Sequence, residues 1–457
     1  MFEEIPVDVG LVHEGERIRK NDMQIELGGP KVDEKFELVR LKPAREIESG
    51  SIHIIGPDIP DLEEGKSHPF GILIEIAGPE LEENLEGVIE RRIHEYCNYI
   101  EGLMHLNQRY DIWMRLSKKA FQKGLDSFRF LGMAMQELFR NELPIIEDIQ
   151  ITFITDPEEV KARYDEALAI YEARDARARG LSDEDVDVFY GCALCQSFAP
   201  THVCVVTPQR YANCGAISWF DGRAAARIDP KGPIFPIEKG ECLDTETGEY
   251  TGVNESAQAR SMGEVSRIQL YSGFGYPHTS CGCFEAIAFY IPEVAGYGIV
   301  HRGFTDLAVN GLPFSTMADS TAGGRQIDGF HGISIEYMRS EKFLQADGGY
   351  DAVVWIPVEI KDRLKDYIPE DVSPAIATEK DVQTIGDLKE FLLSHSHPVT
   401  ARWVKEEEEP EEAPVMTAGE IPITTGGFRI ILKNARIYAD RVIIQPVQPK
   451  KPGRGDS

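Results

Sequence analysis

The sequence predicts a mixed α+β protein of more than one domain. Its 457 residues suffice for about two to four domains, and 42% of them are apolar, which allows an ample core. Short β-rich runs bounded by Gly and Pro alternate with stretches of helical periodicity. Six of the eight cysteines are confined to residues 192–214 and 281–283. These observations predict an N-terminal α/β domain at 1–155, a cysteine-rich domain at 156–403, and an acidic linker and tail at 404–457.

The first predicted domain begins with strands and continues with two helices. Strands are expected at 36–41, 51–55 and 70–76. Apolar residues recur at helical spacing over 79–104, and Cys97 lies on that stripe, so we interpret it as a core residue. A second helix is predicted over 111–123. Its polar side carries four basic residues: Arg115, Lys118, Lys119 and Lys123.

The second predicted domain follows a strand at 150–155. A helix is expected from Pro157 to about residue 179, because Asp156 can cap its first turn and acidic residues follow. Further strands are predicted at 201–206, 267–271 and 351–357, and further helices from Phe284 onward and at 384–394. Residues 229–252, rich in Gly and Pro, predict an excursion loop that holds Cys242 as a non-ligand thiol.

The composition excludes several classes of protein. The net charge of −29 argues against binding to nucleic acid or to anionic membranes. The N-terminal residues lack the pattern of a secretory signal, and no apolar run is long enough to cross a bilayer. The cysteines are clustered like ligands rather than spread as disulfide pairs, which is typical of a reducing compartment. We therefore expect a cytoplasmic protein.

Four cysteines form the first candidate metal site. They follow the spacing C-x2-C-x8-C-x9-C, and four thiolates on one short loop system can hold a tetrahedral zinc ion or a cubane iron–sulfur cluster. The ligands would be Cys192, Cys195, Cys204 and Cys214.

The tripeptide Cys281-Gly282-Cys283 forms the second candidate site. Its thiols are too close in sequence to form an unstrained disulfide easily, but they can chelate one metal from the same side. If the two intervening backbone amides lose their protons, the tripeptide offers an N2S2 square plane, which nickel(II) prefers. Glycine at the centre lets the backbone fold tightly around the metal.

At these residues the chain resembles the acetyl-CoA synthase family. The four-cysteine spacing, the Cys-Gly-Cys tripeptide and the interval between Cys214 and Cys281 are similar to those of the archaeal beta subunit of the acetyl-CoA decarbonylase/synthase complex. The resemblance implies a [4Fe-4S] cluster on the four-cysteine motif and two nickel ions. Cys195 would bridge the cluster to the proximal nickel. Cys281 and Cys283 would bridge the proximal nickel to the distal nickel. The backbone nitrogens of Gly282 and Cys283 would also hold the distal nickel. Phe198 matches a phenylalanine beside the proximal metal.

The resemblance also implies a reaction and partners. The reaction would be the assembly of acetyl-CoA from a methyl group, CO and coenzyme A, or the reverse cleavage. The methyl group would come from a methylated corrinoid iron–sulfur protein and the CO from a carbon monoxide dehydrogenase component. Two alternatives remain: a [4Fe-4S] electron-transfer protein without nickel, and a scaffold with zinc in the four-cysteine loop.

The predicted basic helix is a candidate coenzyme A site. Arg115 and Lys119 could hold the phosphates of coenzyme A or acetyl-CoA, and the resemblance places coenzyme A contacts in this domain. The alternative is a solvated helix face paired with nearby carboxylates.

Three further features are interpreted from their sequence context. His278, three residues before Cys281, is expected to be structural. Residues 323–325 and 329–332 are expected to form tight loops near the metal site. Beyond the charged linker at 405–414, strands at 428–432 and 441–445 would form an element that packs on the body or docks a partner.

Overall fold

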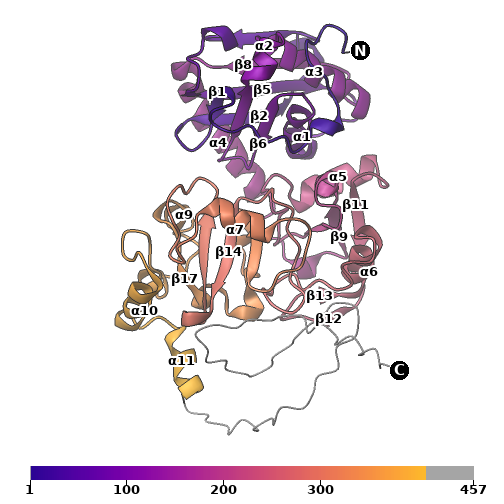
Figure 1. Ribbon diagram of the computed structural model, residues 1–457. Coiled ribbons are helices and arrows are strands. Elements are labelled where there is room, and N and C mark those ends of the chain that lie inside the picture. Colours follow the sequence, from indigo (N-terminus) through magenta and orange to yellow (C-terminus); the bar gives the residue numbers. More distant parts are fainter. Residues whose placement is uncertain (1, 408–457) are drawn as a thin grey trace, which may run out of the picture. The chain divides into compact units, whose positions relative to one another are not determined.

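The computed structural model describes residues 2–407, which form a mixed α+β protein as predicted (Figure 1). The N-terminal part contains two four-stranded sheets, ordered β2-β5-β8-β3 and β4-β1-β7-β6. The strands of the first sheet are β2 (Lys35–Leu41), β3 (Ile52–Ile55), β5 (Phe70–Ala77) and β8 (Asp148–Ile154). Those of the second are β1 (Met23–Gly28), β4 (Ser67–His68), β6 (Leu103–Leu106) and β7 (Trp113–Ser117). The strands predicted at 36–41, 51–55, 70–76 and 150–155 are thus confirmed.

Four helices accompany these sheets: α1 (Glu86–Asn98), α2 (Lys118–Gln122), α3 (Phe128–Glu142) and α4 (Pro157–Ala176). Helix α4 begins as predicted, since the Asp156 side chain accepts hydrogen bonds from the backbone N–H groups of Glu158 and Glu159. Cys97 is fully buried in the core, as expected.

Buried ion pairs join α1 to α4. The Arg174 guanidinium lies 2.8 Å from a carboxylate oxygen of Glu86 and 2.8 Å from one of Glu90. Arg109 and Asp175 form a further buried pair at 2.5 Å. The two pairs of Arg174 fix the position of α1, which also carries residues that reach the cysteine cluster.

The C-terminal part contains the sheets β10-β9-β11 and β16-β14-β15-β17 and the hairpin β12-β13 (Figure 1). The strands are β9 (Val188–Cys192), β10 (Cys204–Val206), β11 (Ile234–Glu238), β12 (Cys242–Asp244), β13 (Glu249–Tyr250), β14 (Ala286–Ile291), β15 (Gly296–His301), β16 (Phe330–Ile333) and β17 (Val353–Trp355). The helices are α5 (Trp219–Ile228), α6 (Thr251–Arg260), α7 (Phe314–Thr321), α8 (Ile335–Met338), α9 (Val358–Arg363), α10 (Ile385–Ser394) and α11 (Thr400–Glu407). The short strands predicted near Cys204 and at 351–357, and the helix at 384–394, are confirmed.

Two predicted helices of the N-terminal part are wrong in extent or type. Within residues 79–104 the α-helix is limited to α1, which a short 3-10 helix at Glu83–Leu85 precedes. It ends at Asn98, whose side chain bonds the backbone of His105 where the chain enters β6. Residues 111–123 contain the strand β7 at 113–117, followed by the helix α2 at 118–122, so only the second half of this range is helical. In β7, buried Met114 and Leu116 alternate with less buried Trp113 and Arg115. In so short a window the apolar residues fit either period, and pairing with β1 and β6 decides for the strand.

Four predictions in the C-terminal part are also corrected. Residues from 286 form β14 rather than a helix, because the sheet buries this continuous apolar run. Residues 267–271 form only isolated bridges at Gln269. The expected loop at 229–252 contains β11, which pairs with β9, and the hairpin β12-β13. Residues 330–333 form β16.

The linker predicted at 405–414 overlaps the end of α11, and the strands predicted at 428–432 and 441–445 lie outside the described residues. The domain boundaries at 155/156 and 403/404 stay predictions. No helix within residues 2–407 combines the length and apolar character of a membrane span.

Arg174→Met is expected to lower the free energy of unfolding by about 3–5 kcal/mol, because it leaves the buried carboxylate of Glu90 without its ion-pair partner and leaves Glu86 only its longer pair with Arg40 at 3.4 Å. The measurement is chemical denaturation. The control is Arg163→Met, which removes an exposed pair with Glu159 and should cost about 0.3–0.5 kcal/mol. Equal losses in the two variants would contradict this role.

Candidate metal centre

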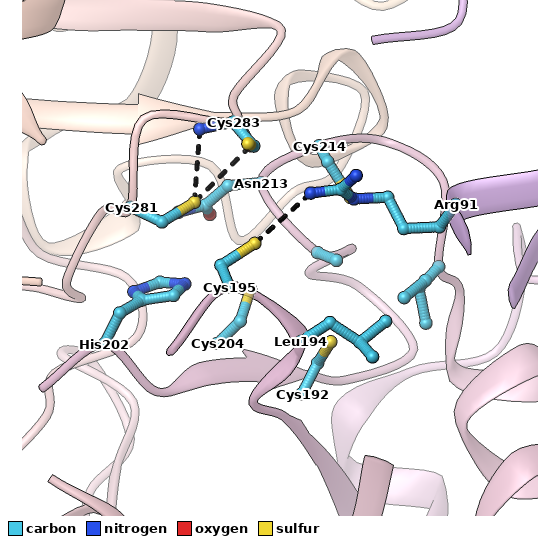
Figure 2. Close-up of a pocket in the computed structure, with 12 residues that line it drawn as sticks. Arg91, Cys192, Leu194, Cys195, His202, Cys204, Asn213, Cys214, Cys281 and Cys283 are labelled. Atoms are coloured by element: carbon cyan, nitrogen blue, oxygen red, sulfur yellow. Dashed lines mark hydrogen bonds between the residues drawn. The ribbon is translucent and has the colours of Figure 1, made fainter. Parts of the chain in front are cut away.

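The six clustered cysteines meet in one buried cavity. It is lined by all four cysteines of the first motif and by Cys281 and Cys283, together with Arg91, Leu194, His202 and Asn213 (Figure 2). All six thiols are buried. The structure therefore brings together two cysteine motifs that are far apart in the sequence.

Antiparallel pairing positions the four-cysteine motif. Cys192 ends β9 and lies directly opposite Cys204, which begins β10. Cys195 lies on a short 3-10 helix, Leu194–Ser197. Cys214 occupies a tight turn in which the Gly215 N–H bonds the Ala212 carbonyl. Gly215 has φ +75°, and a Cβ there would meet the Glu285 carboxyl, so glycine is required at this turn.

The Cys281-Gly282-Cys283 loop precedes β14 and has the shape of a chelate. The backbone nitrogen of Cys283 lies 3.2 Å from the Cys281 sulfur, and Gly282 has φ +129°, which favours glycine. The loop rests on residues 323 and 324, whose N–H groups donate to the carbonyl oxygens of Cys281 and Ser280. The prediction that residues 323–325 lie near the site is therefore confirmed.

Three sulfur atoms, those of Cys195, Cys281 and Cys283, lie within 4.8 Å of one another. This trio joins one cysteine of the first motif to both cysteines of the second. Three convergent thiols are suitable ligands for a soft transition metal. Phe198 lies beside Gly282, since a Cβ on that glycine would be 3.9 Å from its ring, and Phe198 itself is 39% exposed.

The thiols share their protons unequally. Hydrogen bonding with Cys195 and Cys281 lowers the pKa of Cys283, and the Arg91 and Arg302 guanidinium groups act in the same direction. Burial raises the pKa of Cys204 to about 12 and that of Cys214 to about 11. Metal ions that bind here must therefore displace protons.

Two residues of α1 reach the cysteine cluster, and the sequence analysis did not identify either. Arg91 donates to the Cys195 sulfur at 3.4 Å, as Figure 2 shows. Burial opposes its charge, but Cys283, Cys195 and Cys214 outweigh it and raise its pKa. His94 lies 3.7 Å from the Cys283 sulfur and contacts His105. The sequence indicated Arg91 and His94 only as a charged and a polar residue in a helix that is otherwise rich in apolar positions.

The other predicted residues are placed as follows. His278 is buried and structural: its Nδ1 donates to the Thr279 carbonyl and its Nε2 accepts from the Val205 N–H. Cys242 is exposed, outside the cluster. Arg115 lies on β7, 14% exposed, with its Nε 2.7 Å from Glu26. Lys119 lies on α2, 79% exposed, 3.7 Å from Glu101.

The fold and the site together define a mixed α+β protein with a buried cluster of cysteines that could hold a metal. Two family profiles match this chain. Residues 5–160 match the family described as CO dehydrogenase/acetyl-CoA synthase complex beta subunit, and residues 171–403 match the family that describes the C-terminal part of the ACS/CODH beta subunit. The chain belongs to this beta subunit family.

Relatives of known name cover nearly the whole chain. The acetyl-CoA decarbonylase/synthase complex subunit beta of Methanothermobacter thermautotrophicus is 55% identical, over 97% of this chain and 100% of the relative. The same subunit of Methanopyrus kandleri is 52% identical, over 97% of each chain. A solved C-terminal domain from the alpha subunit of acetyl-CoA synthase is 37% identical over 26% of this chain and 95% of that chain, with a TM-score of 0.24.

Metal affinity is expected to rise with pH, because binding must release protons from thiols whose pKa is raised. For each proton released, affinity should increase about tenfold per pH unit below the thiol pKa. The measurement is a titration of the metal-free protein with cobalt(II) at several pH values between about 6.5 and 8.5. The absorption of the cobalt–thiolate complex gives the affinity at each pH. Cys242→Ser is the control and should change nothing. An affinity independent of pH would contradict the expectation.

Proposed function

We propose that this chain is an acetyl-CoA synthase/decarbonylase, which reversibly assembles or cleaves acetyl-CoA from a corrinoid-bound methyl group, CO and coenzyme A. The observation that carries the proposal is the convergence of Cys195 with Cys281 and Cys283, which brings their sulfur atoms within 4.8 Å of one another. An iron–sulfur electron carrier needs only the four-cysteine motif and has no use for this trio. Membership of the beta subunit family supports the same reaction.

The proposed cofactors are a [4Fe-4S] cluster and two nickel ions. The donors fit this assignment: four buried thiols of one motif line the cavity, and the trio lies in the same cavity. The proximal nickel is assigned to Cys195, Cys281 and Cys283, and the distal nickel to the two sulfurs and two backbone nitrogens of residues 281–283. When bound, the nickel centre supplies an electron-rich metal on which CO and a methyl group can meet.

The residues of the chain have supporting tasks in this proposal. Arg91 donates a hydrogen bond to the Cys195 sulfur and so brings a positive charge next to this proposed ligand. Burial lowers the pKa of His94 well below its usual value, so this side chain stays neutral beside Cys283. The Phe198 ring lies beside Gly282, and Phe198 is 39% exposed, so we assign it to contact with reactants that enter from solvent.

The proposed partners are the proteins that would supply the reactants of this reaction. A methylated corrinoid iron–sulfur protein would supply the methyl group and a carbon monoxide dehydrogenase component the CO. The relatives carry the name of a complex subunit, which supports assembly with such components.

The double variant Cys281→Ala/Cys283→Ala is expected to keep about four iron ions per chain and lose both nickel ions, because the four-cysteine motif is left intact. Metal analysis of anaerobically reconstituted protein is the measurement, with exchange of CO into acetyl-CoA as the activity readout. The control is Cys242→Ser, which should keep both metals and the activity. Equal nickel in wild type and double variant, or none in either, would leave a [4Fe-4S] electron-transfer protein as the function.

The phosphates of coenzyme A are proposed to bind near α2. Lys118, Lys119 and Lys123 expose their ammonium groups there, although each also has a carboxylate partner. The Arg115 guanidinium instead contacts Glu26, the Ile18 carbonyl and the Trp113 ring, which is compatible with a structural task.

Replacement of Arg115 and Lys119 together by Gln is expected to raise the KM for coenzyme A by up to about tenfold without change in metal content, because a phosphate contact at an exposed site contributes at most about 1.5 kcal/mol. The single variants separate the tasks: Lys119→Gln should account for the KM change, whereas Arg115→Gln should lower the melting temperature. An unchanged KM in the double variant would show that coenzyme A does not bind at this surface.

A further inference from the structure

Arg302 contacts the backbone of the Cys-Gly-Cys loop. It follows β15, and its guanidinium donates to the Gly282 carbonyl oxygen at 2.7 Å and, more weakly, to the Phe284 carbonyl at 3.4 Å. The guanidinium also lies 5.0 Å from the centre of the Phe314 ring. Burial lowers the pKa of Arg302, while Cys283, Asp111 and Cys281 favour its charged form. Its charge is thus directed at the loop.

The contacted oxygen belongs to the same peptide unit as a candidate metal donor. The Gly282 carbonyl and the Cys283 N–H form one planar peptide, so they point in opposite directions. The Cys283 nitrogen lies 3.2 Å from the Cys281 sulfur, on the chelating side of the loop. The guanidinium therefore fixes the plane of the peptide whose nitrogen faces the proposed distal metal.

The contact also has an electronic consequence. When a peptide nitrogen binds a metal, one N–H bond is replaced by one metal–nitrogen bond, the proton leaves to solvent and no electron is transferred. Resonance spreads the resulting negative charge to the carbonyl oxygen of that peptide. A guanidinium on this oxygen then makes a charge-assisted hydrogen bond, which is stronger than the bond to a neutral carbonyl.

The second peptide of the chelate is supported differently. Its oxygen, that of Cys281, accepts from the Gly323 N–H at 3.2 Å, a neutral donor. The oxygen of the Gly282–Cys283 peptide instead accepts from a cationic donor, Arg302. Because a cationic donor stabilises a negatively charged peptide more than a neutral one does, we expect Arg302 to have the larger effect on the chelate.

We propose that Arg302 is a positioning residue that makes the Cys281-Gly282-Cys283 loop selective for a square-planar metal, because it holds the Gly282–Cys283 peptide in place and stabilises its nitrogen as a donor. This inference rests on the proposed nickel function of the same loop. A tetrahedral metal bound by thiolates alone makes no use of the peptide nitrogen. The selectivity between nickel and zinc therefore reports on Arg302.

The test uses the full chain, reconstituted anaerobically with iron and sulfide and then titrated with nickel or with zinc. Arg302→Gln should weaken nickel binding about 10- to 100-fold, the value of a hydrogen bond to a charged group, and change zinc binding less than about threefold. Arg302→Lys retains the charge and should lie between Arg302→Gln and wild type. The absorption of square-planar nickel should weaken in the same order.

Arg402→Gln is the matched control. Arg402 also donates to two backbone carbonyls, those of Ala295 and Asp347, away from the metal loop, so nickel binding should not change. Equal nickel affinity in Arg302→Gln and wild type, or a parallel fall for nickel and zinc, would overturn the inference. Absence of nickel from the wild type itself would instead overturn the proposed function. Iron content and melting temperature identify a misfolded variant, in which case Arg302→Lys decides.

Discussion

Compensation of charge around the buried thiols is the constraint on which the site depends. Six thiols line one cavity, and each that ionises loses its hydration, which is costly unless a cation is near. The chain provides guanidinium groups from two distant segments: Arg91 at the Cys195 sulfur and Arg302 at the Gly282 carbonyl. Metal ions would supply the remaining positive charge. The trio of sulfurs and the two arginines therefore form one electrostatic unit.

The same constraint explains the ion pairs that surround α1. Arg91 can be useful at the cluster only if its helix is held firmly, and Arg174 clamps that helix through Glu86 and Glu90. Both carboxylates lie within about two helical turns of Arg91 along α1. The N-terminal part of the chain thus contributes structure to a site whose candidate ligands all come from the C-terminal part. Removal of the clamp and removal of Arg91 are expected to affect the site through the same helix.

Several elements could be predicted because local sequence decides them. The Asp156–Pro157 start of α4 and the alternating pattern of β8 are set by residues within a few positions. Elements whose type depends on pairing could not be predicted in this way. Residues 113–117 and 286–291 are apolar enough for a helix, and only the neighbouring strands make them β7 and β14. Arg91, His94 and Arg302 escaped prediction because no spacing rule links them to the cysteines.

The sequence alone determined the candidate donors, because thiolate number, spacing and the central glycine of Cys281-Gly282-Cys283 are written into short motifs. It also indicated the family and the mixed α+β class. Spacing could not say which cysteine of the first motif meets Cys281 and Cys283, and the tertiary structure places Cys195 there, as the family resemblance implies. Only the tertiary structure decided which cations face the thiols. The physical reason is that these contacts join segments separated by many residues, and their distances follow from sheet pairing and helix packing rather than from local preference.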